Sequence, residues 1–224
     1  MTFLPGNLAG CLRAAMPCLL ALCLAAIGPT ALARTPEPAA ARSGYEYYRI
    51  GNLQATRPGD IEPAMLLLGG GQWPRQAFAW LAGKAGHGHF VILRASGSDD
   101  LQRELYTDVG GVASVQTLVF HSRAAASDPA VLDIVRRADG IFIAGGDQAN
   151  YVRFWQGTPL NTLLDRHVAE GKPIGGNSAG LAILGGHAYG ALDGGSIVAD
   201  EALRDPLGKG VTLVDGFLHM PYLR

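Results

Sequence analysis

Cysteine is almost absent from this sequence of 224 residues. The three cysteines, Cys11, Cys18 and Cys23, all lie near the N-terminus. Beyond them the chain offers no thiol nucleophile and no thiolate ligand for a metal ion. It also cannot form the disulfide framework that holds many small exported domains together. The fold must therefore be held by its hydrophobic core alone.

The sequence also has no large excess of charge of one sign. The 18 lysines and arginines nearly balance the 19 aspartates and glutamates, which gives a formal net charge of −1. This balance does not provide a basic surface for a polyanion, so we expect no nucleic-acid partner. Gly86-His87-Gly88-His89 has the spacing of a metal pair, but no carboxylate-rich segment accompanies it. We expect no metal and no cofactor.

Apolar runs long enough for a transmembrane helix, about 20 residues, are also missing. The N-terminal apolar stretch over residues 16–27 follows Arg13 and precedes Ala31-Leu32-Ala33. A positive charge, a short apolar stretch and an Ala-x-Ala site predict a cleaved signal peptide over residues 1–33. We expect a secreted or periplasmic protein that is free of the membrane after cleavage.

The chain after this signal divides into a leader and one domain. Residues 34–62 are interpreted as a Pro/Ala-rich leader followed by an ambiguous segment, in which Tyr45, Tyr47 and Tyr48 could pack at an edge. The folded domain is expected over residues 63–224. No internal repeat and no coiled-coil pattern is visible.

Short apolar runs alternate with helix-like patterns in this domain. Strands are predicted at residues 64–68, 90–93, 114–120 and 140–144, with a further strand before residue 177. Asp128-Pro129 and Thr158-Pro159 each predict the start of a helix. Continuous apolar strands alternating with helices favour an α/β fold, in which helices cover both faces of a parallel sheet. Ligands of such sheets bind at the carboxyl ends of the strands.

A Gly-x-Ser-x-Gly turn follows the last predicted strand. In Gly176-Asn177-Ser178-Ala179-Gly180 the turn stands between an apolar run and a helix-like segment, which is the layout of a nucleophile elbow. We therefore interpret Ser178 as a catalytic nucleophile. The Ala179 N–H is the expected first oxyanion donor, and the glycine turn at Gly145-Gly146 could supply the second. The general base stays open, because no spacing singles out one of the six histidines.

Three segments together resemble the cyanophycinase and dipeptidase E family of serine peptidases. They are residues 141–148 (Ile-Phe-Ile-Ala-Gly-Gly-Asp-Gln) with Asn150-Tyr151, the elbow at residues 173–180, and residues 122–129 (Ser-Arg-Ala-Ala-Ala-Ser-Asp-Pro). The resemblance runs from about residue 63 to the end of the sequence. It implies a flavodoxin-like sheet of the class I glutamine-amidotransferase type. It also implies hydrolysis of peptide or isopeptide-like bonds through an acyl-enzyme, and a possible homodimer.

The resemblance also implies roles for single residues. Ser178 would be the nucleophile, Gly146 and Ala179 the oxyanion hole, and Gln148 a substrate contact. The acid of the family triad best matches Glu201, with Asp193 as the alternative.

One departure from the family pattern concerns the histidine. The family carries it in an Asp-x-His-Phe segment, placed just after the region that matches residues 211–224. No such segment occurs here, and His219 does not occupy that place. The sequence is therefore interpreted as truncated at its C-terminus. Two other functions stay open: an α/β-hydrolase-type esterase, and an inactive exported binding homologue.

Overall fold

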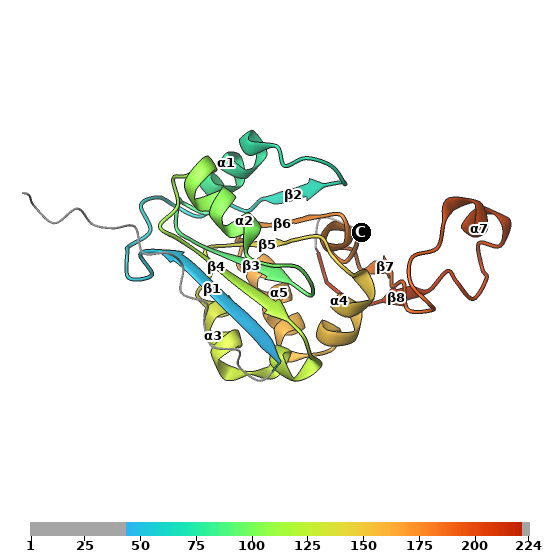
Figure 1. Cartoon of the computed structure of the whole chain (residues 1–224). Coiled ribbons are helices and arrows are strands. Elements are labelled where there is room, and N and C mark those ends of the chain that lie inside the picture. The colour runs from blue at the N-terminus through green and yellow to red at the C-terminus, as the bar shows by residue number, and fades with distance from the viewer. Residues whose placement is uncertain (1–43, 221–224) are drawn as a thin grey trace, which may run out of the picture. The chain divides into compact units, whose positions relative to one another are not determined.

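A computed structural model describes residues 44–220 of the chain (Figure 1). The predicted signal peptide over residues 1–33, its cysteines and the predicted leader up to residue 43 lie outside the described residues. Within residues 44–220, no helix combines the length and the apolar character that a membrane span requires.

A six-stranded sheet forms the centre of the fold. Its strands are β1 (Tyr45–Gly51), β2 (Met65–Leu68), β3 (His89–Arg94), β4 (Ser114–Phe120), β5 (Gly140–Ile143) and β6 (Ile174–Asn177). Their order across the sheet is β1-β4-β3-β5-β6-β2, and every neighbouring pair is parallel except β1 with β4. The predicted α/β fold is confirmed, and the predicted parallel sheet is mostly parallel, with β1 as the antiparallel strand.

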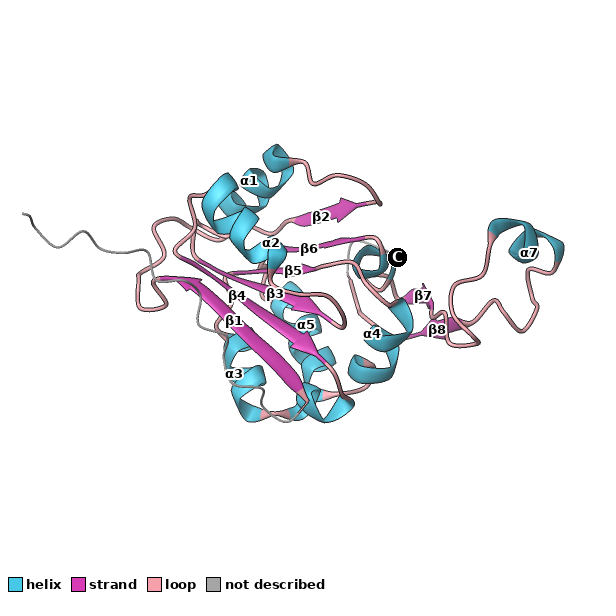
Figure 2. Ribbon diagram, in the orientation of Figure 1, coloured by secondary structure: helices cyan, strands magenta, loops and turns pink. Residues whose placement is uncertain are grey.

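Helices cover both faces of this sheet (Figure 2). One face carries α1 (Arg75–Lys84), α2 (Asp100–Arg103) and the π-helical turn Glu104–Val109. The other face carries α3 (Pro129–Arg136), α4 (Gln148–Trp155), α5 (Pro159–Ala169) and α6 (Ala179–Ala182), together with the 3-10 turn Arg123–Ser127. This two-sided cover explains why the central strands are continuous apolar runs rather than alternating ones.

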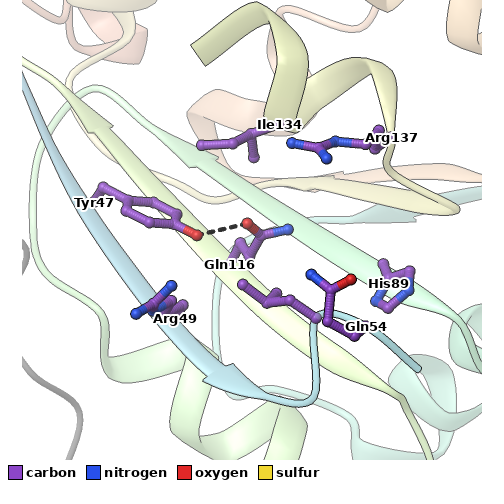
Figure 3. A pocket seen from close by; sticks show the side chains of 8 residues that line it. Tyr47, Arg49, Gln54, His89, Gln116, Ile134 and Arg137 are labelled. Carbon is purple, nitrogen blue, oxygen red and sulfur yellow. Dashed lines mark hydrogen bonds between the residues drawn. The ribbon is translucent and has the colours of Figure 1, made fainter. Parts of the chain in front are cut away.

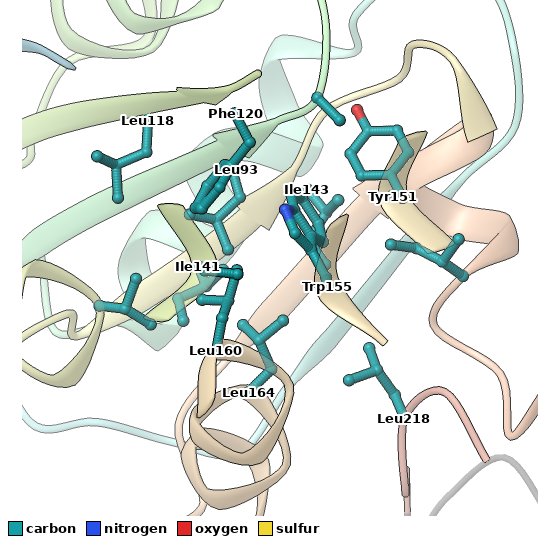
Figure 4. Close-up of a cluster of buried hydrophobic side chains, with 14 of the residues drawn as sticks. Leu93, Leu118, Phe120, Ile141, Ile143, Tyr151, Trp155, Leu160, Leu164 and Leu218 are labelled. Carbon is teal, nitrogen blue, oxygen red and sulfur yellow. The ribbon is translucent and has the colours of Figure 1, made fainter. Parts of the chain in front are cut away.

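The larger of the two cores lies beneath α3, α4, α5 and α6 (Figure 4). Trp155 is fully buried there, with its ring edge-on to Phe120 at 5.2 Å and to Tyr151 at 4.7 Å between ring centroids. Burying an aromatic side chain of this kind stabilises the fold by about 1.5–3 kcal/mol. Since Tyr151 and Trp155 both belong to α4, this packing fixes the helix that follows β5.

Strand β1 comes from the stretch for which the sequence predicted no element. Tyr45 and Tyr47 face the larger core, while Glu46 and Tyr48 point to the other side and bond each other through carboxylate and hydroxyl. The strand therefore alternates with the period of two that suits a half-exposed edge strand. It pairs antiparallel with β4 from Tyr45–Phe120 to Gly51–Ser114. The sheet is thus larger than the fully parallel one expected, and it begins before residue 63.

The last described segment extends beyond the sheet. Strands β7 (His187–Tyr189) and β8 (Leu213–Asp215) form a two-stranded hairpin, and α7 (Ala199–Arg204) lies in the long connection between them. No residue of α7 is buried. Figure 1 shows α7 well away from the end of β6. We call residues 190–212 the arm.

Candidate active site

The carboxyl ends of β2, β5 and β6 are held together by hydrogen bonds. The Ser178 N–H donates to the Leu68 carbonyl at 3.1 Å, which ties the turn after β6 to the end of β2. The Gly145 N–H donates to Asn177 Oδ1 at 2.7 Å, which ties the turn after β5 to the end of β6. The glycine turn and the serine turn predicted separately from the sequence therefore meet at one edge of the sheet.

Ser178 has the backbone conformation of a nucleophile elbow. Its φ of 50° and ψ of −123° lie in a region that a residue with a Cβ rarely adopts. The residue is exposed, and it stands at the N-cap of α6 without a side-chain capping bond. Its hydroxyl is therefore not engaged by the first turn of the helix, unlike many N-cap serines. The turn presents the oxygen to solvent at the carboxyl edge of the sheet.

The two elbow glycines are required by close backbone approaches. A Cβ at position 176 would lie 2.5 Å from the Gly180 carbonyl oxygen, and a Cβ at position 180 would lie 2.1 Å from the Ile143 carbonyl oxygen. Backbone atoms cannot move aside as a flexible side chain can, so any larger residue would displace the turn. The crowding explains why a sharp strand-to-helix turn at this place needs glycine on both sides of the serine.

The predicted oxyanion donors lie beside the serine. Ala179 is the first residue of α6, where helix N–H groups have no partner within the helix. The loop with Gly146 reaches the same place, since a Cβ on the preceding Gly145 would lie 3.1 Å from the Ser178 Cβ. The structure thus brings Ser178, Ala179 and Gly146 into one neighbourhood, at the positive end of a short helix.

Side chains that the sequence analysis had not singled out hold the Gly146 loop. The Asp147 N–H donates to Ser96 Oγ at 3.2 Å, and the Asp147 carboxylate caps α4 by accepting from the Ala149 N–H at 3.0 Å. The buried Tyr151 hydroxyl donates to the Ala144 carbonyl, and burial raises the pKa of Tyr151 to about 12. Ser96 follows the end of β3 and carries no sequence signal, and Asn177 occupies the variable position of the elbow motif, so only the assembled sheet reveals their bonds to this loop.

Gln148, the predicted substrate contact, is the first residue of α4. Its amide nitrogen donates to the backbone carbonyl of Tyr189 at the end of β7. The structure therefore places the start of α4 next to the hairpin. The substrate role of Gln148 stays a prediction.

The predicted acid is not brought to the serine. Glu201 lies exposed on α7, in the arm. Asp193, the alternative, pairs with Lys209 at 3.8 Å, again in the arm. Neither carboxylate contacts Ser178 or a histidine among the described residues. The triad role of Glu201 stays a prediction that this arrangement does not support.

The histidines have other partners. Among residues 44–220, no hydrogen bond joins a histidine to Ser178. The pairs are His187 with Asp215 at 2.7 Å, His219 with Asp165 at 3.1 Å, His121 with Glu46 at 3.1 Å, His87 with the Gly111 carbonyl at 2.6 Å, and His89 with Ser114 at 2.8 Å. His167 is buried, which lowers its pKa to about 4, and its ring bonds the Pro173 carbonyl at 3.0 Å.

The spacing of His87 and His89 does not form a metal centre here. The two rings bond different partners, and no group of three or more potential metal-binding side chains gathers within the described part of the chain. The candidate site consists of Ser178, the start of α6 and the glycine loop at Gly145-Gly146; the oxyanion roles of Ala179 and Gly146 stay predictions.

Part of this chain is similar to known peptidases. Residues 101–202 match the model of peptidase family S51. Cyanophycinases from Synechococcus elongatus and from Thermosynechococcus vestitus are each 41% identical over 99 residues, which covers 42% of this chain. The match spans 31% of the length of each of these curated relatives. The crystal structure of a peptidase from an acI-B1 Actinobacterium superposes with a TM-score of 0.53 at 18% identity, covering 71% of this chain and 66% of the other, and shows the same fold.

Proposed function

Since residues 101–202 match the model of peptidase family S51, we propose that this chain carries the nucleophile of a cyanophycinase-like serine peptidase. The proposed reaction is hydrolysis of peptide or isopeptide-like bonds through an acyl-enzyme at Ser178. The observation that supports it best is the exposed serine in a strained strand-to-helix turn, with its hydroxyl not used for capping. No observation favours the esterase alternative.

The first step is attack of the Ser178 hydroxyl oxygen on the substrate carbonyl carbon. The hydroxyl proton leaves as the C–O bond forms, and the carbonyl oxygen gains a negative charge. In our proposal the Ala179 and Gly146 N–H groups stabilise that charge. One preorganised donor of this kind accelerates catalysis by about a hundredfold to a thousandfold. The tetrahedral intermediate then expels the protonated amine and leaves an ester on Ser178.

Water completes the reaction by attacking this ester. The acyl group leaves as a carboxylic acid, and the proton returns to the Ser178 oxygen. A general base must take the proton in each half of the cycle. Glu201 remains the proposed acid of the triad, and its test requires a base to be identified first.

The substrate class is proposed from the relatives. Because the matched proteins are named cyanophycinases, we propose cyanophycin-type peptides as the first substrates to test. We also propose export to the periplasm or the exterior, based on the signal-like N-terminal sequence, and a homodimer, based on the family resemblance.

Covalent labelling tests the role of Ser178. We expect a fluorophosphonate probe to label the wild-type protein at Ser178, with peptide mapping by mass spectrometry as the measurement. Ser178→Ala should abolish labelling, because alanine retains the Cβ but has no oxygen. Ser196→Ala, which removes an exposed serine of the arm, is the matched control and should label normally. Undiminished labelling of Ser178→Ala would contradict the proposal.

A further inference from the structure

A pocket lies on the β1-β4-β3 part of the sheet, away from the elbow. Its volume is about 460 Å³, within the range of small-molecule sites. It lies between the β1-β4-β3 face of the sheet and the end of α3, and His89, the first residue of β3, forms one side (Figure 3). The elbow lies instead at the carboxyl ends of the strands. The pocket lies over β1, β4 and β3, whereas the elbow follows β6, which is two strands beyond β3 in the sheet.

Positive charge dominates this pocket. Arg49 from β1 and Arg137 from the end of α3 both line it. Among the described residues Arg49 forms no salt bridge, and Arg137 shares the carboxylate of Asp133 with Arg136. The two arginines that line the pocket therefore have one carboxylate between them among the described residues, and Arg136, outside the pocket, shares it. A guanidinium suits the planar geometry of a carboxylate ligand.

A buried amide adds a directed donor. The Tyr47 hydroxyl donates to Gln116 Oε1 at 2.7 Å, and Gln116 is only 9% exposed. This bond fixes the orientation of the amide, so that its nitrogen points away from Tyr47 into the space between the labelled side chains (Figure 3). No acceptor for this nitrogen is recorded among residues 44–220. Gln116 Nε2 is not among the fully buried unpartnered atoms of residues 44–220, so it is open to the pocket, where a ligand oxygen would accept its hydrogen bond.

The wall of the pocket is held in place by His89. Its Nδ1 lies 2.8 Å from Ser114 Oγ, and its Nε2 lies 3.0 Å from the Ala55 carbonyl, to which it donates. The loop after β1 is also tied by the Asn52 N–H to the Ala113 carbonyl at 2.9 Å. The loop that carries Leu53 and Gln54 is thus anchored at both ends, so the pocket is preformed.

Leu53 and Ile134 give this pocket an apolar part. A bare inorganic anion would leave that surface in water, whereas an organic acid would cover it. We propose that the pocket binds a small organic carboxylate, with the acid group held by Arg49, Arg137 and the Gln116 amide and the apolar body on Leu53 and Ile134. This second site does not depend on the chemistry of Ser178.

Calorimetric titration with N-acetyl-leucine tests the proposal, since this probe combines a carboxylate with an apolar side chain. We expect saturable binding to the wild-type protein. Arg49→Gln and Arg137→Gln should each weaken it by about tenfold or more, because each removes a charge-assisted hydrogen bond. Arg103→Gln is the matched control, since Arg103 is exposed on α2 at the other face of the sheet.

Two further probes define the ligand class. N-acetyl-leucinamide, which lacks the charge, and inorganic phosphate, which lacks the apolar body, should both bind at least tenfold more weakly. Protein blocked at Ser178 by the phosphonate, or Ser178→Ala, should bind N-acetyl-leucine as the wild type does. The proposal fails if the wild type does not bind, if the two arginine variants bind normally while folded by circular dichroism, or if either control probe binds equally well.

Discussion

At the scale of single residues, the glycines and the serine of the elbow are needed for different reasons. Gly176 and Gly180 are fixed by backbone atoms within 2.5 Å of where a Cβ would stand. Ser178 is different, because its own Cβ makes the turn strained and glycine would fit better. The glycines thus follow from the path of the chain, whereas the serine must follow from chemistry.

The burial of His167 predicts how the free energy of unfolding depends on pH. Burial lowers its pKa from 6.5 to about 4 in the folded state. Between these values the unfolded chain binds a proton that the folded chain does not, so the free energy of unfolding falls as the pH falls. The loss is on the order of 3 kcal/mol and is complete near pH 4, while the contribution is fully present above about pH 6.5.

Urea unfolding of wild type and His167→Gln at about pH 7 and about pH 4.5 measures this effect. Glutamine can still donate to the Pro173 carbonyl but does not titrate, so the variant should lose less stability on acidification. His121→Gln, at an exposed position, should behave as the wild type does. Equal acid sensitivity in wild type and His167→Gln would show that His167 is not held neutral.

At the scale of elements, the N-cap of α4 connects stability to the site. Asp147→Ala removes the capping bond to the Ala149 N–H and should cost about 1 kcal/mol. It should also slow phosphonate labelling of Ser178, because the lost capping bond fixes the start of α4, which directly follows the Gly146 loop. Asp147→Asn retains a capping oxygen and should label at nearly the wild-type rate. Thermal unfolding and labelling rates provide the two measurements.

The N-cap of α3 offers a matched control for this prediction. Asp128→Ala removes an equivalent bond, from the Ala130 N–H at 2.8 Å, but Asp128 caps a helix that does not follow the site loop. It should lower the melting temperature without slowing labelling. An equal slowing in both variants would mean that labelling follows overall stability rather than the geometry of the Gly146 loop.

The sequence predicted the strands and helices whose burial or capping leaves a simple residue pattern, and it missed the others. The central strand β3 was predicted because Phe90, Val91, Ile92 and Leu93 are fully buried and form an unbroken apolar run. Both proline-started helices, α3 and α5, begin at the predicted residues, since Asp128 and Thr158 cap them through their side chains. The edge strand β1 and helix α4 were not predicted. Each mixes polar and aromatic residues, and each is stabilised by partners distant in sequence.

At the scale of the whole molecule, stability should be distributed unevenly. Strand β3 is buried on both faces, while the arm contains exposed Val198, Leu203 and Leu207 and a helix without buried residues. Segments with few buried contacts open at low free-energy cost. The arm and the central sheet should therefore differ in their protection from solvent.

Hydrogen–deuterium exchange measures this difference. We expect peptides covering β3 and β5 to exchange only through global unfolding, and peptides covering α7 to exchange within seconds to minutes. The 3-10 turn Arg123–Ser127 makes a useful internal comparison, because Ala125 and Ala126 are buried and should be protected. Protection of α7 as strong as that of β3 would mean that the arm is packed in solution.

The candidate site was only partly predictable from the sequence, because the sheet fixes the positions of some of its residues and not of others. Ser178, Ala179 and Gly146 lie at strand ends, where the parallel topology brings them together. Glu201 lies in the arm, where no strand determines its position. The position of a residue at a strand end could be predicted because the sheet fixes it, whereas the position of Glu201, inferred from the family resemblance, could not, because the core does not hold the arm.

The backbone strain at Ser178 affects which residue is expected at position 178 as the sequence evolves. Glycine at that position would relieve a backbone conformation that costs on the order of 1–3 kcal/mol, so the chain keeps a less stable residue there. Selection for stability alone would remove the serine and leave the glycines on either side untouched. Under the proposed function, a descendant that no longer needed the reaction would therefore be expected to drift toward glycine at position 178 while its fold stayed intact.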